Sequence, residues 1–302
     1  MHNLGERMGK PPVPTRDAAT VILLRDANES FEIYLMRRHR NQAFMGGAFV
    51  FPGGRLDEKD CDLALLPFVH GMTPGEASQK LHDPDLPGMK AMGLFLSAIR
   101  ETFEECGILL ALDKSGGALD PAFLDAPSLL KYRHSLHEGL MTLGEFAESA
   151  GILFAPRFLI PYSHWITPEV EAKRFDTRFF LTLCPEGQVC VYDSLELTEA
   201  RWSTPEKALA DHKAGQIILM PPTLKTIEEI SGCKTVEMLF DFAHEREIYA
   251  ILPEAFIMDN GFGVKLPYDP EYTIESHRRP YRNNEPSRIV NRDGIWRTAF
   301  PD

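Results

Sequence analysis

The stretch that decides the fold is Arg100-Glu101-Thr102-Phe103-Glu104-Glu105-Cys106-Gly107-Ile108, which has the pattern of an amphipathic helix ending at a glycine. Together with the residues before it, from about residue 89, it carries apolar side chains at three- and four-residue spacing: Phe95, Ile99, Phe103 and Cys106. Glu101, Glu104 and Glu105 gather on the other side of the helix. Three neighbouring carboxylates repel one another, and a hard divalent cation that prefers oxygen ligands removes the repulsion. The pattern alone also fits a solvated glutamate-rich helix face.

A second segment points to a site rather than a plain surface. The short apolar run of residues 48–51 ends abruptly at Pro52-Gly53-Gly54. Paired glycines allow the backbone to turn sharply and to approach another group closely. A strand that ends in this way predicts a tight corner, and we expect the acidic helix to lie beside it.

The glycine corner and the R-E-x-x-E-E-x-G-U helix (U, apolar) together resemble the signature of the Nudix hydrolases, G-x5-E-x7-R-E-U-x-E-E-x-G-U. The resemblance implies an α+β fold, an α/β/α sandwich around a mixed sheet. The sequence departs from the signature twice. Thr102 replaces an apolar residue, and Gly54 lies 46 positions before Arg100 where the unbroken box has 14. Asp60 occupies the position of the first box glutamate counted from Gly54, and Met92 occupies it counted back from Arg100, so the sequence leaves that role open.

A box interrupted at this point is similar to that of the Nudix branch that contains the peroxisomal coenzyme A diphosphatase of animals. The likeness covers roughly residues 18–230 and is carried by several segments: Phe44–Gly54, Ala98–Glu105, Trp165–Pro168, Arg174–Phe180 and Pro221-Pro222. The other well-known coenzyme A branch has R-x3-G-x3-F-P-G-G, and in this chain Ala43 stands at the arginine position.

The resemblance implies that Mg²⁺ or Mn²⁺ is bound by Glu101, Glu104, Glu105 and the backbone carbonyl of Gly53. Metal ions of this kind neutralise phosphoryl oxygens and align a nucleophile in diphosphate hydrolysis. The resemblance also implies further site residues: Glu101, Arg100 and Glu196 as catalytic, with Glu196 the candidate general base, and Arg174, Phe51 and Gly54 as substrate-binding. A plain ion pair for Arg100, a surface-loop position for Glu196 and a structural Arg174–Asp pair remain open.

The expected activity is metal-dependent hydrolysis of the diphosphate bond in a nucleoside diphosphate linked to another moiety. Coenzyme A or acyl-coenzyme A is the first candidate, with 3′,5′-ADP and (acyl-)4′-phosphopantetheine as products. Alternatives are ADP-ribose, a dinucleotide or a nucleotide sugar. An alternative of another class is a catalytically silent scaffold that binds a ligand or partner, although all three box glutamates are present.

The chain divides into three expected parts: a flexible N-terminal tail (1–17), a Nudix domain (18–232) and a C-terminal extension of helices and strands packed on it (233–302). Within the domain, residues 57–90 contain four prolines and little periodicity, and they predict a surface excursion or lid. Strands are expected at 18–25 and 32–38 as a hairpin, and at 108–112, 158–166, 175–184 and 188–193. Helices are expected at 122–150, broken near Thr142, and at 204–214, 222–231 and 234–246.

The composition limits the kinds of binding partner that we expect. Among 302 residues, 32 Lys and Arg stand against 44 Asp and Glu, a formal charge of −12, which argues against nucleic acid and anionic membranes. A small-molecule nucleotide is the expected partner, and a homodimer is left open. No apolar run approaches the length of a membrane span, and five scattered cysteines predict no disulfide framework. We expect a cytoplasmic protein, because neither a signal-peptide core nor a peroxisomal C-terminal tripeptide is recognisable.

Overall fold

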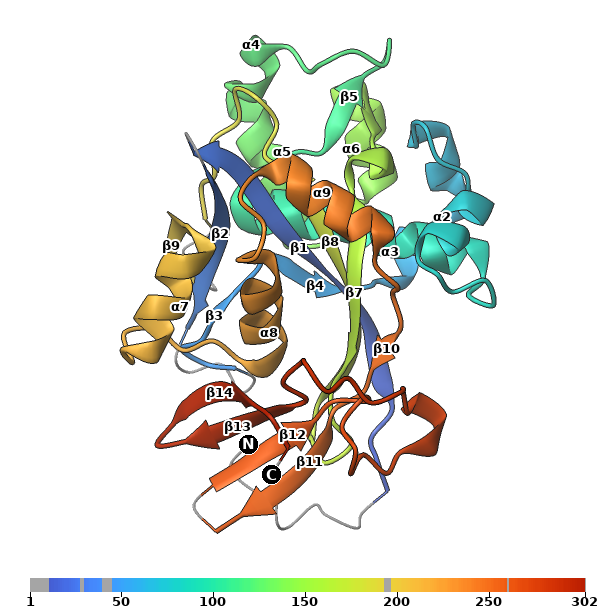
Figure 1. Ribbon diagram of the computed structural model, residues 1–302. Coiled ribbons are helices and arrows are strands. Elements are labelled where there is room, and N and C mark those ends of the chain that lie inside the picture. Colours follow the sequence, from blue (N-terminus) through green and yellow to red (C-terminus); the bar gives the residue numbers. More distant parts are fainter. Residues whose placement is uncertain (1–10, 28–29, 40–44, 193–196, 260, 302) are drawn as a thin grey trace.

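A twisted mixed sheet forms the centre of the computed structural model, which describes residues 11–27, 30–39, 45–192, 197–259 and 261–301 (Figure 1). Its strands are β1 (Thr15–Ala27), β2 (Ser30–Arg38), β3 (Phe49–Val50), β4 (Gly53–Arg55), β7 (Ile160–Ile166), β8 (Arg174–Leu183), β9 (Leu197–Ser203) and β10 (Ala250–Ile251). The order is β10-β7-β8-β1-β2-β3, with β4 added to β1 and β9 to β2. β1 runs parallel to β8 and antiparallel to β2 and β4. The long strand β1 therefore joins the two halves of the sheet, because it pairs with β8 on one side and with β2 on the other.

Helices cover both faces of the sheet. They are α2 (Pro74–Lys80), α3 (Gly88–Cys106), α4 (Pro121–Leu124), α5 (Pro127–His137), α6 (Leu143–Ala150), α7 (Pro205–Lys213), α8 (Pro221–Ile230) and α9 (Val236–Glu245). Side chains alternate along β1, so that Val21 packs in the core with α3 and Ile22 in the core with α8 and α9. The predicted α/β/α sandwich around a mixed sheet is confirmed.

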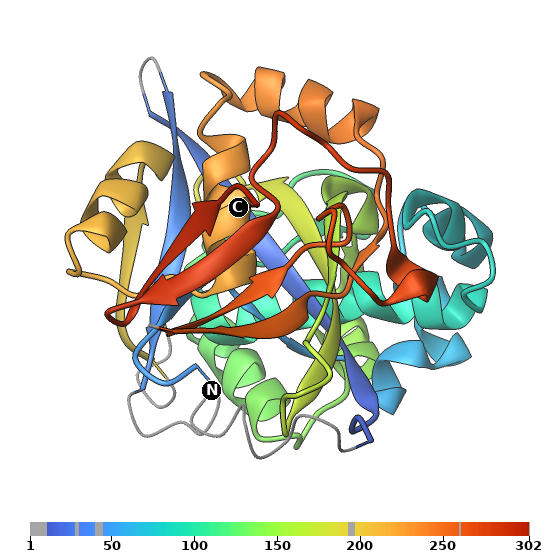
Figure 2. The same cartoon turned by 60° about the horizontal axis from the view of Figure 1, so that its bottom comes forward.

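The C-terminal residues add a second sheet beneath α8 (Figures 1 and 2). It is antiparallel and consists of β11 (Glu254–Met258), β12 (Gly261–Lys265), β13 (Arg288–Arg292) and β14 (Ile295–Ala299). Val264, Ile289 and Trp296 are buried in the same core as Ile22 of β1. The last 70 residues therefore share a core with the central sheet.

The segment 57–90 is packed rather than a surface excursion or lid, which corrects the expectation. It forms two 3₁₀ helices (Glu58–Cys61 and Leu63–Phe68) and α2, and its last residues already belong to α3. Four of its apolar side chains are buried in the core on the α3 side: Leu65, Met72, Ala77 and Leu81. Short 3₁₀ pieces and prolines leave no long periodic signal, which is why the pattern missed them. The Thr73–Glu76 capping box of α2 was readable.

Other boundaries differ from expectation for local reasons. The hairpin of β1 and β2 forms, and Thr142 caps α6 where the helical stretch was expected to break. The expected tail of residues 1–17 overlaps β1, because Thr15 pairs with Arg174 of β8. The expected strand at 108–112 begins only at β5 (Ala111–Asp113), which pairs with β6 (Ile152–Phe154).

The strand expected at 188–193 is absent over its described part, 188–192. The side chain of Gln188 instead binds the backbone of Leu109, accepting from its N–H at 2.8 Å and donating to its carbonyl at 3.0 Å. Strand β9, with charged residues at Glu199 and Arg201, was not predicted because it lacks a clear apolar alternation. Within the described residues, no helix is both long and apolar enough to span a bilayer.

Replacing Trp296 by alanine tests how far the C-terminal sheet stabilises the whole molecule. Trp296 is 3% exposed and packs edge-on against Phe262, while its carbonyl lies 2.9 Å from Nε2 of the buried His212. We expect Trp296→Ala to lower the free energy of unfolding by about 3–5 kcal/mol, measured by urea denaturation. Phe300→Ala, at a side chain 53% exposed, should change it by less than about 0.5 kcal/mol. Similar effects of both variants would show that this sheet is dispensable for the core.

Candidate active site

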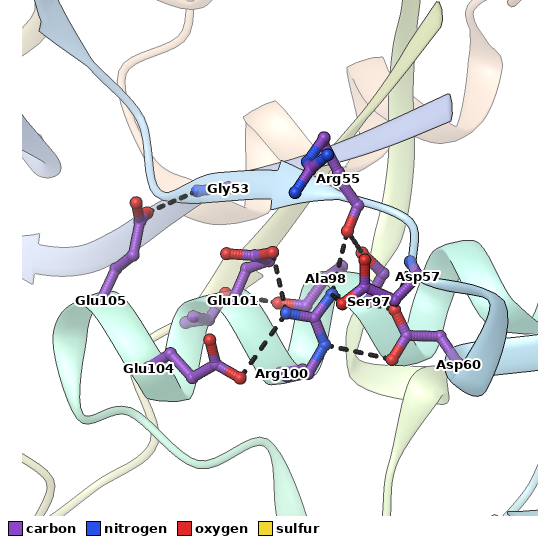
Figure 3. A network of polar contacts seen from close by, with 11 residues as sticks. Gly53, Arg55, Asp57, Asp60, Ser97, Ala98, Arg100, Glu101, Glu104 and Glu105 are labelled. Atoms are coloured by element: carbon purple, nitrogen blue, oxygen red, sulfur yellow. Dashed lines mark hydrogen bonds and ion pairs between the residues drawn. The ribbon is translucent and has the colours of Figure 1, made fainter. Parts of the chain in front are cut away.

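The glycine corner touches the acidic helix directly, as expected. Gly53 opens β4 with a φ of 155°, and a Cβ there would lie 2.3 Å from the Ala19 carbonyl oxygen, so only glycine fits. Its backbone N–H donates to Oε2 of Glu105 at 2.8 Å (Figure 3). A Cβ on the next residue, Gly54, would lie 2.3 Å from the Glu101 carboxylate. The two glycines therefore let two carboxylates of α3 reach the backbone of β4.

Arg100 lies at the centre of the acidic cluster (Figure 3). Its Nε and Nη2 donate to the two carboxylate oxygens of Asp60 at 3.0 and 2.9 Å. Nη1 donates to Glu101 at 2.8 Å and lies 3.5 Å from Glu104. Nη2 also donates to the carbonyl of Arg55 at 2.9 Å. The side chain is 11% exposed, so Arg100 is a buried hub and not a plain surface ion pair.

The charge of Arg100 is secured by its partners. Burial by itself lowers the pKa of the guanidinium, but the hydrogen bonds to Asp60 and the charges of Glu101 and Glu104 outweigh burial and raise it. Arg100 therefore stays protonated at every physiological pH and neutralises part of the acidic cluster.

The two residues that align with the first glutamate of the box, Asp60 and Met92, lie in different surroundings. The Asp60 side chain is 3% exposed and faces Arg100, and it also accepts from the Asp57 backbone N–H at 3.0 Å. Met92 is fully buried in the apolar core. Asp60, which lies within the segment 57–90, is thus the carboxylate that faces the box arginine.

Thr102, which replaces the apolar residue of the signature, is fully buried. Its Oγ1 donates to the Ala98 carbonyl at 2.7 Å, so the core accommodates the threonine without an unsatisfied hydroxyl.

The two other acids beside Arg100, Glu101 and Glu104, are largely buried, and the pKa of each is raised. Burial raises the pKa of Glu104 to about 7, partly offset by Arg100 and reinforced by Glu101. Burial likewise raises the pKa of Glu101, against the opposing effect of Arg100. Oε1 of Glu104 is buried without a hydrogen bond in the described part of the chain. A single guanidinium does not satisfy these carboxylates, and a hard divalent cation would.

Among the described residues, no group of three or more Asp, Glu, His or Cys side chains is arranged so that it could hold a metal ion by itself. A hard divalent cation can combine carboxylate and backbone carbonyl oxygens with water and substrate phosphates, so it does not require a cage made by protein side chains alone. The donors present at the corner therefore fit such a cation, which Nudix hydrolases generally use.

The acidic cluster opens into a cavity of about 660 Å³, a size usual for small-molecule sites. The predicted residues Gly53, Gly54, Phe51 and Glu105 line it, together with Arg100, Glu101 and Glu104. The segments that carried the resemblance outside the box also meet there: Trp165–Pro168, Phe175 and Pro221-Pro222. Pro253 and Val264 of the last 70 residues complete its wall.

Arg174 does not belong to this cavity, which corrects its expected contact with substrate. It is 8% exposed, and its guanidinium donates to the carbonyls of Val13 and Thr167 at 2.8 and 3.0 Å. Alternation along β8 sends Phe175 to the cavity and Arg174 to the other face. Asp176, the proposed partner in a structural pair, binds His164 and Arg178 instead. Glu196 lies outside the described residues.

Three basic residues that were not predicted from the sequence also line the cavity: Arg38, Arg55 and Lys173. Arg55 directly follows the glycine pair, and that adjacency was a usable signal. Lys173 lies one residue before the noted Arg174–Phe180 segment, and only the placement of β8 beside β1 brings it to the site.

The fold and this site define the class: a diphosphatase of the Nudix type, with the acidic helix set against a glycine corner of a mixed sheet. A family model described as the NUDT19 Nudix domain matches residues 15–230, and the chain belongs to this family of Nudix hydrolases.

Individual relatives agree with this assignment. The chain is 26% identical to the acyl-coenzyme A diphosphatase NUDT19 of Xenopus laevis, over 87% of this chain and 79% of the relative. It is 28% identical to that of Gallus gallus, over 86% and 82%. A crystal structure of a NUDIX hydrolase from Alicyclobacillus acidocaldarius superimposes with a TM-score of 0.61 at 25% identity, covering 76% of this chain and 96% of that one.

Removing the charge of Asp60 tests its part in the site. Asp60→Asn keeps the shape of the side chain but weakens its hold on Arg100, which orients Glu101. We expect a tenfold to hundredfold loss of diphosphatase activity, because Asp60 holds Arg100 and Arg100 in turn orients Glu101 in the acidic cluster. Glu58→Gln removes an exposed charge from the same 3₁₀ helix and should leave activity unchanged. Equal activity of wild type and Asp60→Asn, with both proteins folded by circular dichroism, would show that Asp60 does not contribute to activity.

Proposed function

We propose that the protein hydrolyses the diphosphate bond of coenzyme A or acyl-coenzyme A, with Mg²⁺ or Mn²⁺, to 3′,5′-ADP and (acyl-)4′-phosphopantetheine. The observation that carries the proposal is the contact of Glu105 and Glu101 with the Gly53-Gly54 backbone at the wall of a large cavity. The names of the Xenopus and Gallus relatives support coenzyme A as the substrate.

The residues that would hold the metal are Glu101, Glu104, Glu105 and the Gly53 carbonyl. A divalent cation bound there would supply charge neutralisation at the phosphoryl oxygens and a more acidic water. Arg100 keeps Glu101 oriented through the 2.8 Å hydrogen bond and holds the end of β4 through the Arg55 carbonyl. The general base is proposed to be Glu196 or one of the box glutamates.

The cavity wall supports a substrate with both charged and apolar parts. Arg38, Arg55 and Lys173 provide positive charge for phosphates, and none of them forms an ion pair with a described residue. Trp165, Met220, Pro221, Pro253 and Val264 provide an apolar surface on the same cavity. A nucleotide diphosphate that carries a long, mostly apolar arm, as in an acyl-pantetheine, matches this combination.

A substrate panel with two glutamate variants tests the proposal. Coenzyme A, an acyl-coenzyme A, ADP-ribose, a dinucleoside polyphosphate and a nucleotide sugar are incubated with Mg²⁺, Mn²⁺ or EDTA, and products are separated by chromatography. We expect hydrolysis of the coenzyme A species, abolished by EDTA, with formation of 3′,5′-ADP. Glu105→Gln and Glu101→Gln should each lower kcat/KM about 100-fold or more, because each removes a charge that holds the cation.

Glu148→Gln, at an exposed glutamate of α6, is the matched control and should behave as wild type. Activity confined to ADP-ribose or nucleotide sugars would replace the proposed substrate while retaining the chemistry. Failure to hydrolyse any diphosphate with metal present would identify a silent binding scaffold and contradict the proposal.

A further inference from the structure

We infer that Lys173 and Phe175 form a recognition site for the ribose 3′-phosphate of coenzyme A, apart from the site that binds its diphosphate. The inference rests on the proposed function and adds the residues that distinguish a 3′-phosphorylated nucleotide from one that lacks this group. It is carried by the register of three adjacent strands and by the positions of the basic residues in the cavity.

Strand register places Arg55 and Phe175 on one face of the sheet. Arg55 of β4 pairs with Ala18 of β1, and Ala18 pairs with Thr177 of β8, so these three residues form a row across the sheet. Phe175 lies two residues before Thr177 on the same face, and all four line the cavity. From a strand spacing of about 4.8 Å and a rise of about 3.3 Å per residue, the Cα atoms of Arg55 and Phe175 are about 12 Å apart.

Arg55 belongs to the diphosphate end of this row. It follows the glycine pair directly, and its carbonyl accepts hydrogen bonds from Arg100 at 2.9 Å and from Ser97 at 3.2 Å. Its position is thereby tied to the helix that carries the box glutamates. A phosphate bound near Arg55 would therefore belong to the diphosphate.

Lys173 belongs to the other end. Its ammonium lies 5.3 Å from the centre of the Phe175 ring, and the side chain is exposed to the cavity. Glu171 lines the same cavity, but no ion pair joins an acid to Lys173 within the described residues. In a protein with net charge −12, a lysine without an acidic partner beside an aromatic ring in the substrate cavity suits an anionic group next to a flat base.

The chemistry of the substrate matches this separation. Coenzyme A carries two linked phosphates at the 5′ position of the ribose and a third on its 3′ oxygen, with the adenine on the same sugar. The diphosphate at the metal end and the 3′-phosphate at Lys173 would occupy the two ends of the row, with adenine against Phe175. The site thus recognises the one group that distinguishes coenzyme A from dephospho-coenzyme A.

The test compares these two substrates. kcat/KM is measured for coenzyme A and for 3′-dephospho-coenzyme A with wild type, Lys173→Gln and Arg55→Gln, and with Lys213→Gln as a control at an exposed lysine of α7. We expect Lys173→Gln to lower kcat/KM about tenfold for coenzyme A, chiefly through KM, and to leave dephospho-coenzyme A unchanged. Arg55→Gln should lower both values, and Lys213→Gln neither.

A second measurement is independent of turnover. Competitive inhibition by 3′,5′-ADP and by 5′-AMP reports binding of the nucleotide with and without the 3′-phosphate, and only the former should weaken about tenfold in Lys173→Gln. An equal loss for both substrates would place Lys173 at the diphosphate, and no loss would make it a surface lysine; either result overturns the inference. Wild type that hydrolyses neither coenzyme A species refutes the proposed function instead, a result seen before any variant is compared.

Discussion

The site depends on one interaction, the contacts of the Arg100 guanidinium with three carboxylates and one backbone carbonyl from three parts of the chain. Asp60 comes from the segment after the glycine corner, Glu101 and Glu104 from the helix, and the Arg55 carbonyl from the strand. Because the side chain is almost buried, each of these contacts is made in a medium where unpaired charge is costly. Loss of the guanidinium would leave several buried carboxylates facing one another without a counter-charge.

The same interaction explains why the acids remain available for a cation. One positive charge stands among Asp60, Glu101 and Glu104, and Glu105 is held separately by the Gly53 N–H. The cluster therefore contains more carboxylates than cationic groups. Burial raises the pKa of Glu104 to about 7, with Arg100 opposing and Glu101 adding to the shift, and one of its oxygens has no hydrogen bond in the described structure. A binding site for a divalent cation requires such an excess of carboxylates, because a cluster already neutralised by protein cations would not attract a further cation.

The sequence predicted those features that depend on short-range patterns. The apolar period of α3, the glycine corner and the hairpin of β1 and β2 are local, and each formed where expected. Features that depend on long-range packing were missed or misplaced. Segment 57–90 has no period of its own and is ordered by burial against α3, whereas Arg174 has a residue type that suits phosphate but projects from the wrong face of β8. Lys173 shows the converse: it adjoins the Arg174–Phe180 segment, but only the placement of β8 beside β1 brings it to a cavity lined by box residues more than 60 positions away.

The interruption of the box illustrates why spacing in sequence and spacing in space must be separated. In the unbroken signature the residue after the first carboxylate leads directly into the helix; in this chain that residue is Cys61, and its counterpart counted back from Arg100 is Gly93. The two meet in the structure, because a Cβ built on Gly93 would lie 2.5 Å from Cys61 Sγ and 3.2 Å from the Asp60 carbonyl. The inserted segment thus starts at Cys61, packs into the core through α2, and ends at Gly93, which lies beside Cys61. A glycine at residue 93 permits that closure, so the contact between Asp60 and Arg100 survives an insertion of about thirty residues.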